Sequence, residues 1–589
     1  MIGNITGPDL MVFLGCIFLL VMAGVLSVRR NRSAAGYFMA ERNLPWWSVA
    51  GSIYATNVSL SQIIGMLGIG YSIGFAQSHY EFLAVPAILL LAHVFIPAYR
   101  KKQVFTLSEF LGDRYNETAR MLYTLIIISV IVILLVGGFY IGSRQLGLLF
   151  SDTAFQLSYF QGILLIAFLS CLLIFFGGMH AVVVAENIIT VLMVVAVVTV
   201  GICTLYQPEI GGFLGLMSLD SSDNGMHKMQ LYLPSDHPDL PWTGVFSGLL
   251  VLHGFFWTTN QFEVQRVLAA RSDRDAQLGT IAAGFLKLTI PFFSIYAGVA
   301  AAYLFRARYG MEGIKPDDAF MFLLDQVVPK GYGLLGLILA GFIGAIFSSI
   351  YSMLNSLSTV VAVDLYKRYL KKDAGDASLV ITGKISVVIV CVIGAWLAWW
   401  SFDPNADGNF FLTLSKNTSY LKPGIVSAFF LGVFWRGVHP ASAAVAILAA
   451  PLLSFMIEWI YDGWLFSIPF FSDHFGTRLN FLHRVFVVFL LCILIQIVMS
   501  SRFKFSGERI LIEETVFKAD YRIFILFIVI NAIALILINQ AILSAQHLAM
   551  PVALGTVVIF NGGFALKSSV KVWSSLLFAM TVWALYWFV

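Results

Sequence analysis

Two polar clusters inside apolar stretches of this sequence could do chemistry, and the first lies in residues 45–81. This segment reads PWWSVAGSIYATNVSLSQIIGMLGIGYSIGFAQSHYE, so it is long enough to cross a membrane although its middle is polar and rich in glycine. Irregular backbone persists at membrane depth only where it is packed in protein or lines a cavity. Interrupted apolar spans of this kind indicate the binding site of a transporter. Glu81 follows at the start of the next span, where a carboxylate is costly and is therefore a functional candidate.

The second cluster lies in residues 341–363, GFIGAIFSSIYSMLNSLSTVVAV, where hydroxyl and amide side chains crowd one apolar span: Ser348, Ser349, Ser352, Asn355, Ser356 and Ser358. Na⁺ prefers several neutral or anionic oxygens, and hydroxyls together with freed backbone carbonyls can supply them. Small residues also let helices approach closely, which is the structural alternative. The presence of a second, interrupted span at 53–68 favours an ion site, because a broken helix offers carbonyls and a serine-rich helix offers hydroxyls.

Other polar side chains fall within apolar spans. Lys287 lies about eleven residues into the span 276–304, which predicts a role in hydrogen bonding to a substrate or in pairing with a carboxylate. Glu186 is either an ion ligand or an interfacial carboxylate. Arg144 is either an outer-interface anchor, which we favour, or a carboxylate clamp. A further polar face comprises His253, Trp257, Asn260, Gln261 and Glu263, and Trp257 with Phe256 could stack on a sugar ring or simply pack.

Lys416 and Lys422 flank the segment KNTSYLKPG, which is unusual within a span, and Pro423 predicts another helix break there. The sequence contains no HExxH, paired CxxC or GxSxG motif, so we do not expect an enzyme. The five cysteines fall in apolar spans without metal-ligand spacing and are interpreted as packing residues.

The composition places these clusters in a membrane. Of 589 residues, 59% are hydrophobic and 12% are charged, whereas about a quarter are charged in soluble domains. Apolar runs of about 20 residues, the length that crosses the hydrocarbon core, recur along the chain. We therefore predict an all-α polytopic protein that forms a single membrane domain over residues 1–589. The net charge of +4 does not indicate nucleic acid, because the basic residues lie in short loops.

The predicted spans number 14 to 16: 9–28, 46–74, 80–99, 122–150, 159–177, 181–206, 243–262, 276–304, 332–362, 378–401, 411–435, 440–461, 482–500, 521–542, 547–563 and 569–589. Lys and Arg gather in alternate loops, which predicts a multi-pass protein of the cell (inner or plasma) membrane with its N-terminus outside. The polar connection 207–242 separates five spans (46–206) from five more (243–435). Because five is odd, the second group is inverted relative to the first, and 1–45 and 436–589 are peripheral.

Several segments resemble the sodium/solute symporter family, and within it the sodium/glucose cotransporters, including bacterial galactose transporters. The similarity covers most of residues 37–436 and is carried by YFMAERNLPWWSVAGSIYATNVSLSQIIGMLGIGYSIG, SHYEF, NQFEVQRVLAARS, FLKLTIPF, FSSIYSMLNSLSTVVAVDLYKRY and KPGIVSAFFLGVFWRG. It implies two inverted five-helix repeats that work by alternating access. It also implies a Na⁺ held by the broken first core helix and the eighth core helix, at Ala55, Val58, Ala345, Ser348 and Ser349. Glu186 stands where members with a second Na⁺ have an Asp, with Ser352 nearby but Tyr351 in place of a small hydroxyl, which argues against a second ion.

The resemblance also implies which residues bind the solute. Positions that contact sugar in the cotransporters match Asn57, Gln62, Glu81 and Lys287. Three positions depart from the pattern: Phe256 replaces the inner-gate tyrosine, His253 stands where an asparagine is expected, and Ser415 stands where a glutamine usually contacts the sugar. The full predicted substrate set is Asn57, Gln62, Glu81, Lys287, Phe256, Trp257, Asn260 and Ser415.

The sequence therefore predicts a secondary active transporter for Na⁺-coupled symport of a small polar solute, with a monosaccharide favoured. Na⁺ is expected as a co-transported ion and not as a permanent cofactor. The alternatives are a Na⁺-coupled symporter of an acidic sugar or other organic anion, with Arg144 or Lys416 neutralising the carboxylate, and a sensor or channel that retains the fold. The expected partners are the solute, Na⁺ and the lipid bilayer; we expect neither nucleic acid nor an obligate protein partner.

Overall fold

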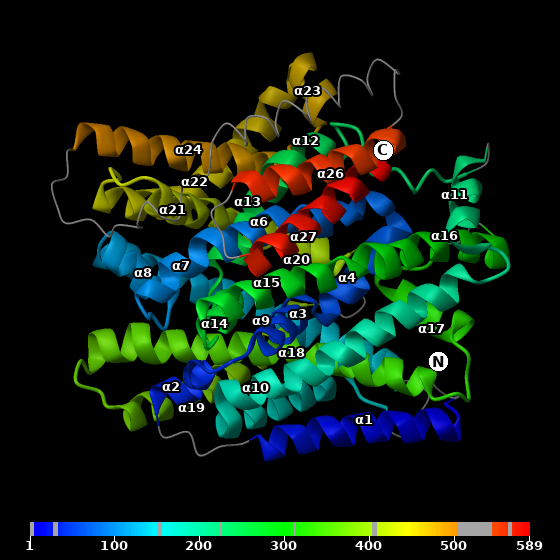
Figure 1. The fold of residues 1–589 in the computed structure, drawn as a ribbon, viewed down its shortest axis with the longest axis horizontal. Coiled ribbons are helices and arrows are strands. Elements are labelled where there is room, and N and C mark those ends of the chain that lie inside the picture. Colours follow the sequence, from blue (N-terminus) through cyan, green and yellow to red (C-terminus); the bar gives the residue numbers. More distant parts are fainter. Residues whose placement is uncertain are drawn as a thin grey trace.

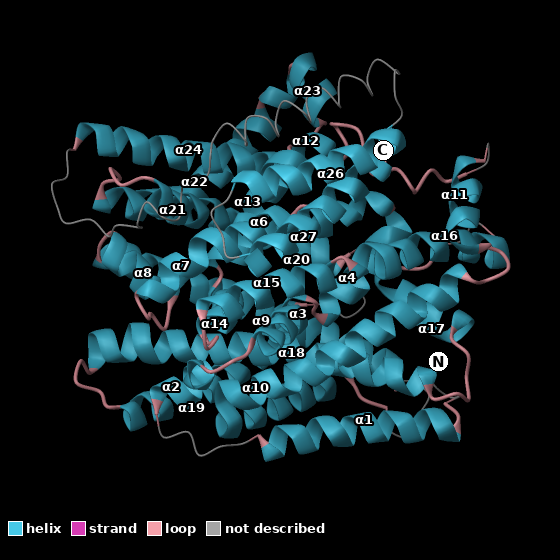
Figure 2. Ribbon diagram, viewed as in Figure 1, coloured by secondary structure: helices cyan, strands magenta, loops and turns pink. Residues whose placement is uncertain are grey.

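A computed structural model describes residues 5–27, 33–150, 156–222, 225–310, 313–402, 409–503, 545–563 and 568–588. Within these ranges the chain forms helices joined by loops (Figure 2), and its two isolated backbone bridges, Leu44–Ala270 and Leu233–Pro241, do not extend into strands. The all-α prediction is confirmed. The predicted span 521–542 lies outside the described residues.

Helices occupy the other predicted spans. The long ones are α1 (Gly7–Leu26), α9 (Glu117–Leu149), α10 (Tyr159–Leu205), α18 (Leu334–Val360), α19 (Asp376–Ser401), α22 (Pro440–Gly463), α24 (Phe481–Arg502), α26 (Ala545–Gly563) and α27 (Ser568–Trp587). The shorter ones are α2 (Ala34–Met39), α3 (Trp46–Asn57), α4 (Leu60–Ser72), α5 (His79–Phe82), α6 (Ala84–Leu90), α7 (Ile96–Lys101), α8 (Leu107–Arg114), α11 (Gly212–Ser221), α12 (Trp242–Gly244), α13 (Leu250–His253), α14 (Gln261–Leu268), α15 (Asp273–Lys287), α16 (Tyr296–Tyr309), α17 (Ala319–Val327), α20 (Phe410–Thr418), α21 (Lys422–Phe434) and α23 (Pro469–Phe475).

Ten helices of the described chain are long and apolar enough to cross a membrane, or eleven when the bent pair α3–α4 counts as one span. This number is smaller than the predicted 14 to 16 partly because breaks divide some spans into short helices, as in 243–262 and 411–435. The predicted spans 159–177 and 181–206 fall in the one element α10, which has 47 residues and is interrupted by the non-helical backbone of Gly178 (φ 58°, ψ −158°). An unbroken helix of that length would extend about 70 Å, more than twice the hydrocarbon core.

The helices lie roughly along the long axis of the molecule (Figure 1). Helix α1 runs along one edge, α22 and α24 pack together near the opposite edge, and α26 packs on α27. Helices α3, α9, α15 and α18 lie toward the centre, where α3 contacts α15 and α10, and α10 in turn contacts α18. The central helices are therefore the ones that can enclose a buried site.

The predicted interruption within 53–68 is a helix break between α3 and α4, which meet at a bend of 55°. Val58 leaves the helical region (φ −83°, ψ 74°), and the Ser59 hydroxyl caps α4 by accepting from the backbone N–H of Gln62 at 3.2 Å. The glycines that follow lie inside α4. A Cβ at Gly68 would come within 2.4 Å of the Pro316 carbonyl oxygen, so this glycine permits close packing of the helix against the 313–318 segment.

A second break interrupts the first span of the other predicted repeat. The π-helical segment Gly254–Thr259 ends at Asn260, whose backbone is extended (φ −93°, ψ 120°), and α14 begins at Gln261. Both breaks expose backbone groups that a continuous helix would satisfy internally. The two breaks border the same buried region, which is described next.

Candidate functional site

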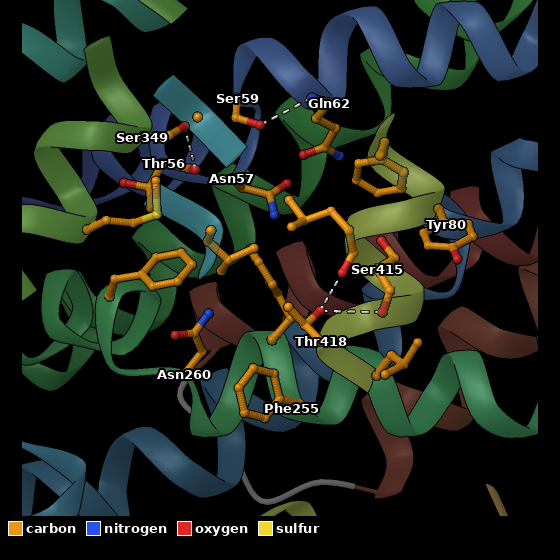
Figure 3. A pocket seen from close by; sticks show the side chains of 18 of the residues that line it. Thr56, Asn57, Ser59, Gln62, Tyr80, Phe255, Asn260, Ser349, Ser415 and Thr418 are labelled. Atoms are coloured by element: carbon orange, nitrogen blue, oxygen red, sulfur yellow. Dashed lines mark hydrogen bonds between the residues drawn. The ribbon is translucent and has the colours of Figure 1, made fainter. Parts of the chain in front are cut away.

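A buried cavity of about 170 Å³ lies between the two helix breaks. Its wall includes all eight predicted substrate residues: Asn57, Gln62, Glu81, Lys287, Phe256, Trp257, Asn260 and Ser415. Figure 3 shows side chains from α3, α4 and α20 and from the segment around Asn260 directed at one common space. The structure thus brings together residues that lie up to 358 positions apart in the sequence, from Asn57 to Ser415.

One wall of the cavity is an ion-paired network. The Lys287 ammonium lies 2.6 Å from Glu81 Oε2 and donates to Asn57 Oδ1 at 2.7 Å, while Gln62 Nε2 donates to Glu81 Oε1 at 2.8 Å. The side chains of Lys287 and Glu81 are 4% and 0% exposed, so both charges are removed from solvent. Lys287 is the last residue of α15, where the partial negative charge of the helix end favours a cation. Of the two roles expected for Lys287, the structure shows the pairing with a carboxylate.

The predicted ion residues lie where α18 passes the end of α3. Ser348 Oγ donates to the Ala55 carbonyl at 2.9 Å, and Ser349 Oγ donates to the Thr56 carbonyl at 3.3 Å. These carbonyls belong to the last turn of α3, and no further helical turn follows to donate backbone N–H groups to them. Ala345 lies one turn before Ser348 and Ser349, and Ala345 and Ser349 also line the cavity. Val58 is the residue that ends the helix. Neutral oxygens converge here, and this donor set suits Na⁺.

Glu186 is fully buried rather than interfacial. It accepts hydrogen bonds from Ser52, Ser352 and Thr56, and Arg266 Nη2 lies 3.2 Å from its Oε1. Both partners of this ion pair are 0% exposed, and neither lines the cavity. The Arg266 guanidinium therefore already provides a positive charge beside Glu186. Among the described residues no group of three or more His, Cys, Asp or Glu side chains could hold a metal ion.

Apart from the ion-paired Glu81, four cavity-lining side chains carry buried polar atoms that have no hydrogen-bond partner among the described residues: Tyr80 Oη, His253 Nε2, Trp257 Nε1, and both Oδ1 and Nδ2 of Asn260. Buried polar groups are normally paired, so unpaired ones concentrated around a cavity need an explanation. Between them they offer donors and acceptors. A solute with several hydroxyl groups would satisfy them.

Two basic residues that could hold an anion lie elsewhere. Arg144 is paired with Asp318 at 3.0 Å and lies 3.9 Å from Asp317, outside the cavity wall. Lys416 is exposed and does not line the cavity. Sequence reasoning missed Tyr80, Thr418 and Lys422 as lining residues. Lys422 could have been predicted, since a lysine within a span is costly and therefore unusual. Tyr80 could not, because a tyrosine at a span boundary is common.

Comparisons with known proteins agree with this arrangement. The sodium:solute symporter family matches residues 37–449. A sodium/glucose cotransporter from Vibrio parahaemolyticus is 30% identical over 498 residues, which are 80% of this chain and 88% of that protein. A sodium/myo-inositol cotransporter 2 from Sus scrofa is 27% identical over 481 residues, which are 75% of this chain and 69% of that protein.

The fold is also similar to a solved structure. A Na⁺-coupled sialic acid symporter in a substrate-bound, outward-open state superposes with a TM-score of 0.72 at 19% identity, and the match covers 86% of this chain and 100% of that one. The family match over most of the chain, together with the cotransporter similarity, decides the assignment. The chain belongs to the sodium:solute symporter family, whose members are transporters and not enzymes and carry Na⁺ as the co-transported ion.

Proposed function

We propose that this protein imports a small polyhydroxylated solute of the monosaccharide class together with Na⁺, by alternating access through the cavity between the helix breaks. The observation that carries the proposal is the set of unpartnered polar atoms on Tyr80, His253, Trp257 and Asn260 around that cavity. A polyol offers hydroxyls that both donate and accept, so it can pair with all of them at once. The two relatives above, a sodium/glucose and a sodium/myo-inositol cotransporter, are named for polyol solutes, which supports the proposal.

Na⁺ would bind at Ala55, Val58, Ala345, Ser348 and Ser349. In this structure the Ser348 and Ser349 hydroxyls donate to carbonyls at the end of α3. Na⁺ at that point would join α3 to α18 and hold the break in one geometry. Asn57, which contacts Lys287 and lines the cavity, is part of the same helix end. The ion would therefore favour the solute-ready state, and coupling is the difference in affinity of each ligand between the two states.

The substrate set Asn57, Gln62, Glu81, Lys287, Phe256, Trp257, Asn260 and Ser415 is part of this proposal. We also propose that the chain is divided into inverted repeats at 46–206 and 243–435. The helix break at the start of each half supports this division. We further propose that the N-terminus lies outside, from the loop charges, and that transport requires the bilayer but no obligate protein partner.

The test uses purified protein in detergent with a panel of probes: D-glucose, D-galactose, myo-inositol, D-glucuronate and D-galacturonate, each in Na⁺ and in choline. We expect at least one polyol to raise the thermal stability in Na⁺ only. Asn260→Ala should abolish or weaken this protection, because it removes a donor and an acceptor from the cavity wall.

Gln145→Ala is the matched control for this variant. Gln145 is also fully buried, and its side-chain amide has no hydrogen-bond partner among the residues that the structure describes, but it does not line the cavity. Its replacement should leave solute protection unchanged. Equal effects of the two substitutions, or protection that does not depend on Na⁺, would contradict the proposal. Accumulation of solute against its gradient separates this proposal from a channel or sensor that retains the fold, because either of those would bind the solute without accumulating it.

A further inference from the structure

The cavity contains a second ammonium group that the network around Glu81 does not use. Lys422, the first residue of α21, lines the cavity, and its ammonium nitrogen lies 5.5 Å from the centroid of the Phe255 ring. Within the described residues no carboxylate lies within 4.0 Å of this ammonium. An ionisable side chain held at membrane depth is costly and indicates a functional site.

The charges on the cavity wall do not balance. The charged lining residues are Glu81, Lys287 and Lys422. Both oxygens of the Glu81 carboxylate already have a partner, because Lys287 lies 2.6 Å from one of them and Gln62 donates to the other at 2.8 Å. The nearby carboxylates Glu186 and Glu263 do not line the cavity, and Glu186 is paired with Arg266. The part of the wall that the structure describes therefore presents one ammonium group, that of Lys422, without a carboxylate partner.

We propose that the solute is a sugar acid of monosaccharide size, and that Lys422 binds its carboxylate while the unpartnered groups of Tyr80, His253, Trp257 and Asn260 bind its hydroxyls. This inference rests on the proposed function and narrows its substrate class. A single carboxylate matches one excess ammonium. A phosphate monoester carries about −1.5 to −2 charges at neutral pH and would leave negative charge buried. The Phe255 ring holds the ammonium by a cation–π contact, which leaves its N–H groups for an anion.

This assignment replaces the two basic residues predicted from the sequence to hold an anion. Arg144 is satisfied by Asp318 at 3.0 Å, and the Lys416 side chain is exposed. Lys422 differs from both because it lines the cavity and has a single described contact, with an aromatic ring.

The experiment measures half-saturating concentrations for thermal protection in Na⁺, using matched pairs of probes: D-glucuronate with D-glucose, and D-galacturonate with D-galactose. We expect at least one acid to bind about tenfold or more tightly than its neutral partner, because a partly desolvated charge pair forms only with the acid. Lys422→Met should weaken the acid by about tenfold or more and change the neutral sugar by less than about twofold. Lys422→Arg keeps the charge and should retain acid preference, and Lys416→Met should change neither.

The outcomes separate this inference from the proposed function. If a neutral sugar protects in Na⁺ and its acid does not, the assignment of the anion is wrong while the polyol symporter stands. If Lys422→Met weakens acid and neutral sugar equally, Lys422 has a structural role and the inference fails. If no probe protects the wild-type protein in Na⁺, the proposed function itself fails. If Lys422→Met does not fold, the comparison of each acid with its neutral sugar on the wild-type protein still tests whether the solute is a sugar acid.

Discussion

Replacing Lys287 by methionine tests the ion-paired wall of the cavity most severely. The Lys287 ammonium is 2.6 Å from Glu81 Oε2 and both side chains are at most 4% exposed, so the substitution leaves a buried carboxylate with Gln62 as its remaining hydrogen-bond partner. Removing one partner of a buried ion pair costs about 3–5 kcal/mol of folding free energy, because the other charge stays desolvated. We expect Lys287→Met to lower the free energy of unfolding by that amount.

The double variant Glu81→Gln/Lys287→Met provides the decisive comparison. Replacing both members of a buried pair by neutral groups is often nearly neutral, so the double variant should be more stable than Lys287→Met alone. Equilibrium unfolding in mixed SDS and detergent micelles, followed by the fluorescence of the 13 tryptophans, measures the wild type, Glu81→Gln, Lys287→Met and the double variant. Lys416→Met, at an exposed position, should stay within about 0.5 kcal/mol of the wild type. A loss below about 1 kcal/mol for Lys287→Met, or strictly additive single effects, would refute the reasoning.

Three further predictions follow from named contacts. Ser349→Ala should raise the Na⁺ concentration that half-saturates solute protection by about fivefold, since a hydrogen-bonding oxygen contributes about 1 kcal/mol. Ser358→Ala should leave this concentration unchanged, because the Ser358 hydroxyl donates to the Asn355 carbonyl of its own helix at 2.7 Å. An unchanged value for Ser349→Ala would remove Ser349 from the ion site. Arg144→Ala should change the half-saturating concentrations of neutral and acidic sugars by less than about twofold, because Arg144 lies outside the cavity wall and pairs with Asp318. A selective loss of protection by the acidic sugars would instead place the anion at Arg144. Burial raises the pKa of Asp317, in the loop before α17, from 3.8 to about 6 against the opposing effect of Arg144. The folded protein therefore binds more protons at this residue than the unfolded chain does between those values, so its contribution to stability is greatest below pH 4 and declines as the pH rises to 6. The free energy of unfolding of the wild type should therefore fall relative to that of Asp317→Asn as the pH rises from 4 to 6, and an unchanged difference would contradict the raised pKa.

The sequence pointed to several polar residues that the structure places around one cavity, and the reason is physical. Asn57, Glu81 and Lys287 are each costly in an apolar span, so each stands out against its neighbours without any knowledge of the fold. Their convergence on one cavity follows from the broken span, since irregular backbone at that depth must be covered by protein. The break itself was predicted within 53–68 and is found between α3 and α4.

Other features depend on contacts between distant segments and could not be predicted. Glu186 reads as an isolated carboxylate until Arg266, 80 positions away, packs beside it. The glycines after Gln62 suggested irregular backbone, but Gly68 lies within α4 and permits close contact with the Pro316 carbonyl. Tyr80 and Lys422 become lining residues only when α20 packs against α4 and α21 packs against the Gly254–Thr259 segment.

Transport against a gradient tests the central claim most directly. Purified protein in liposomes would be given an inward Na⁺ gradient, and accumulation of labelled D-glucose, D-galactose, myo-inositol, D-glucuronate and D-galacturonate would be compared with a choline control. We predict that one of them rises above its external concentration in the Na⁺ gradient and only equilibrates without it, and that Ser349→Ala reduces this accumulation. Equilibration at the same rate and to the same level in Na⁺ and choline would contradict Na⁺-coupled symport through this cavity.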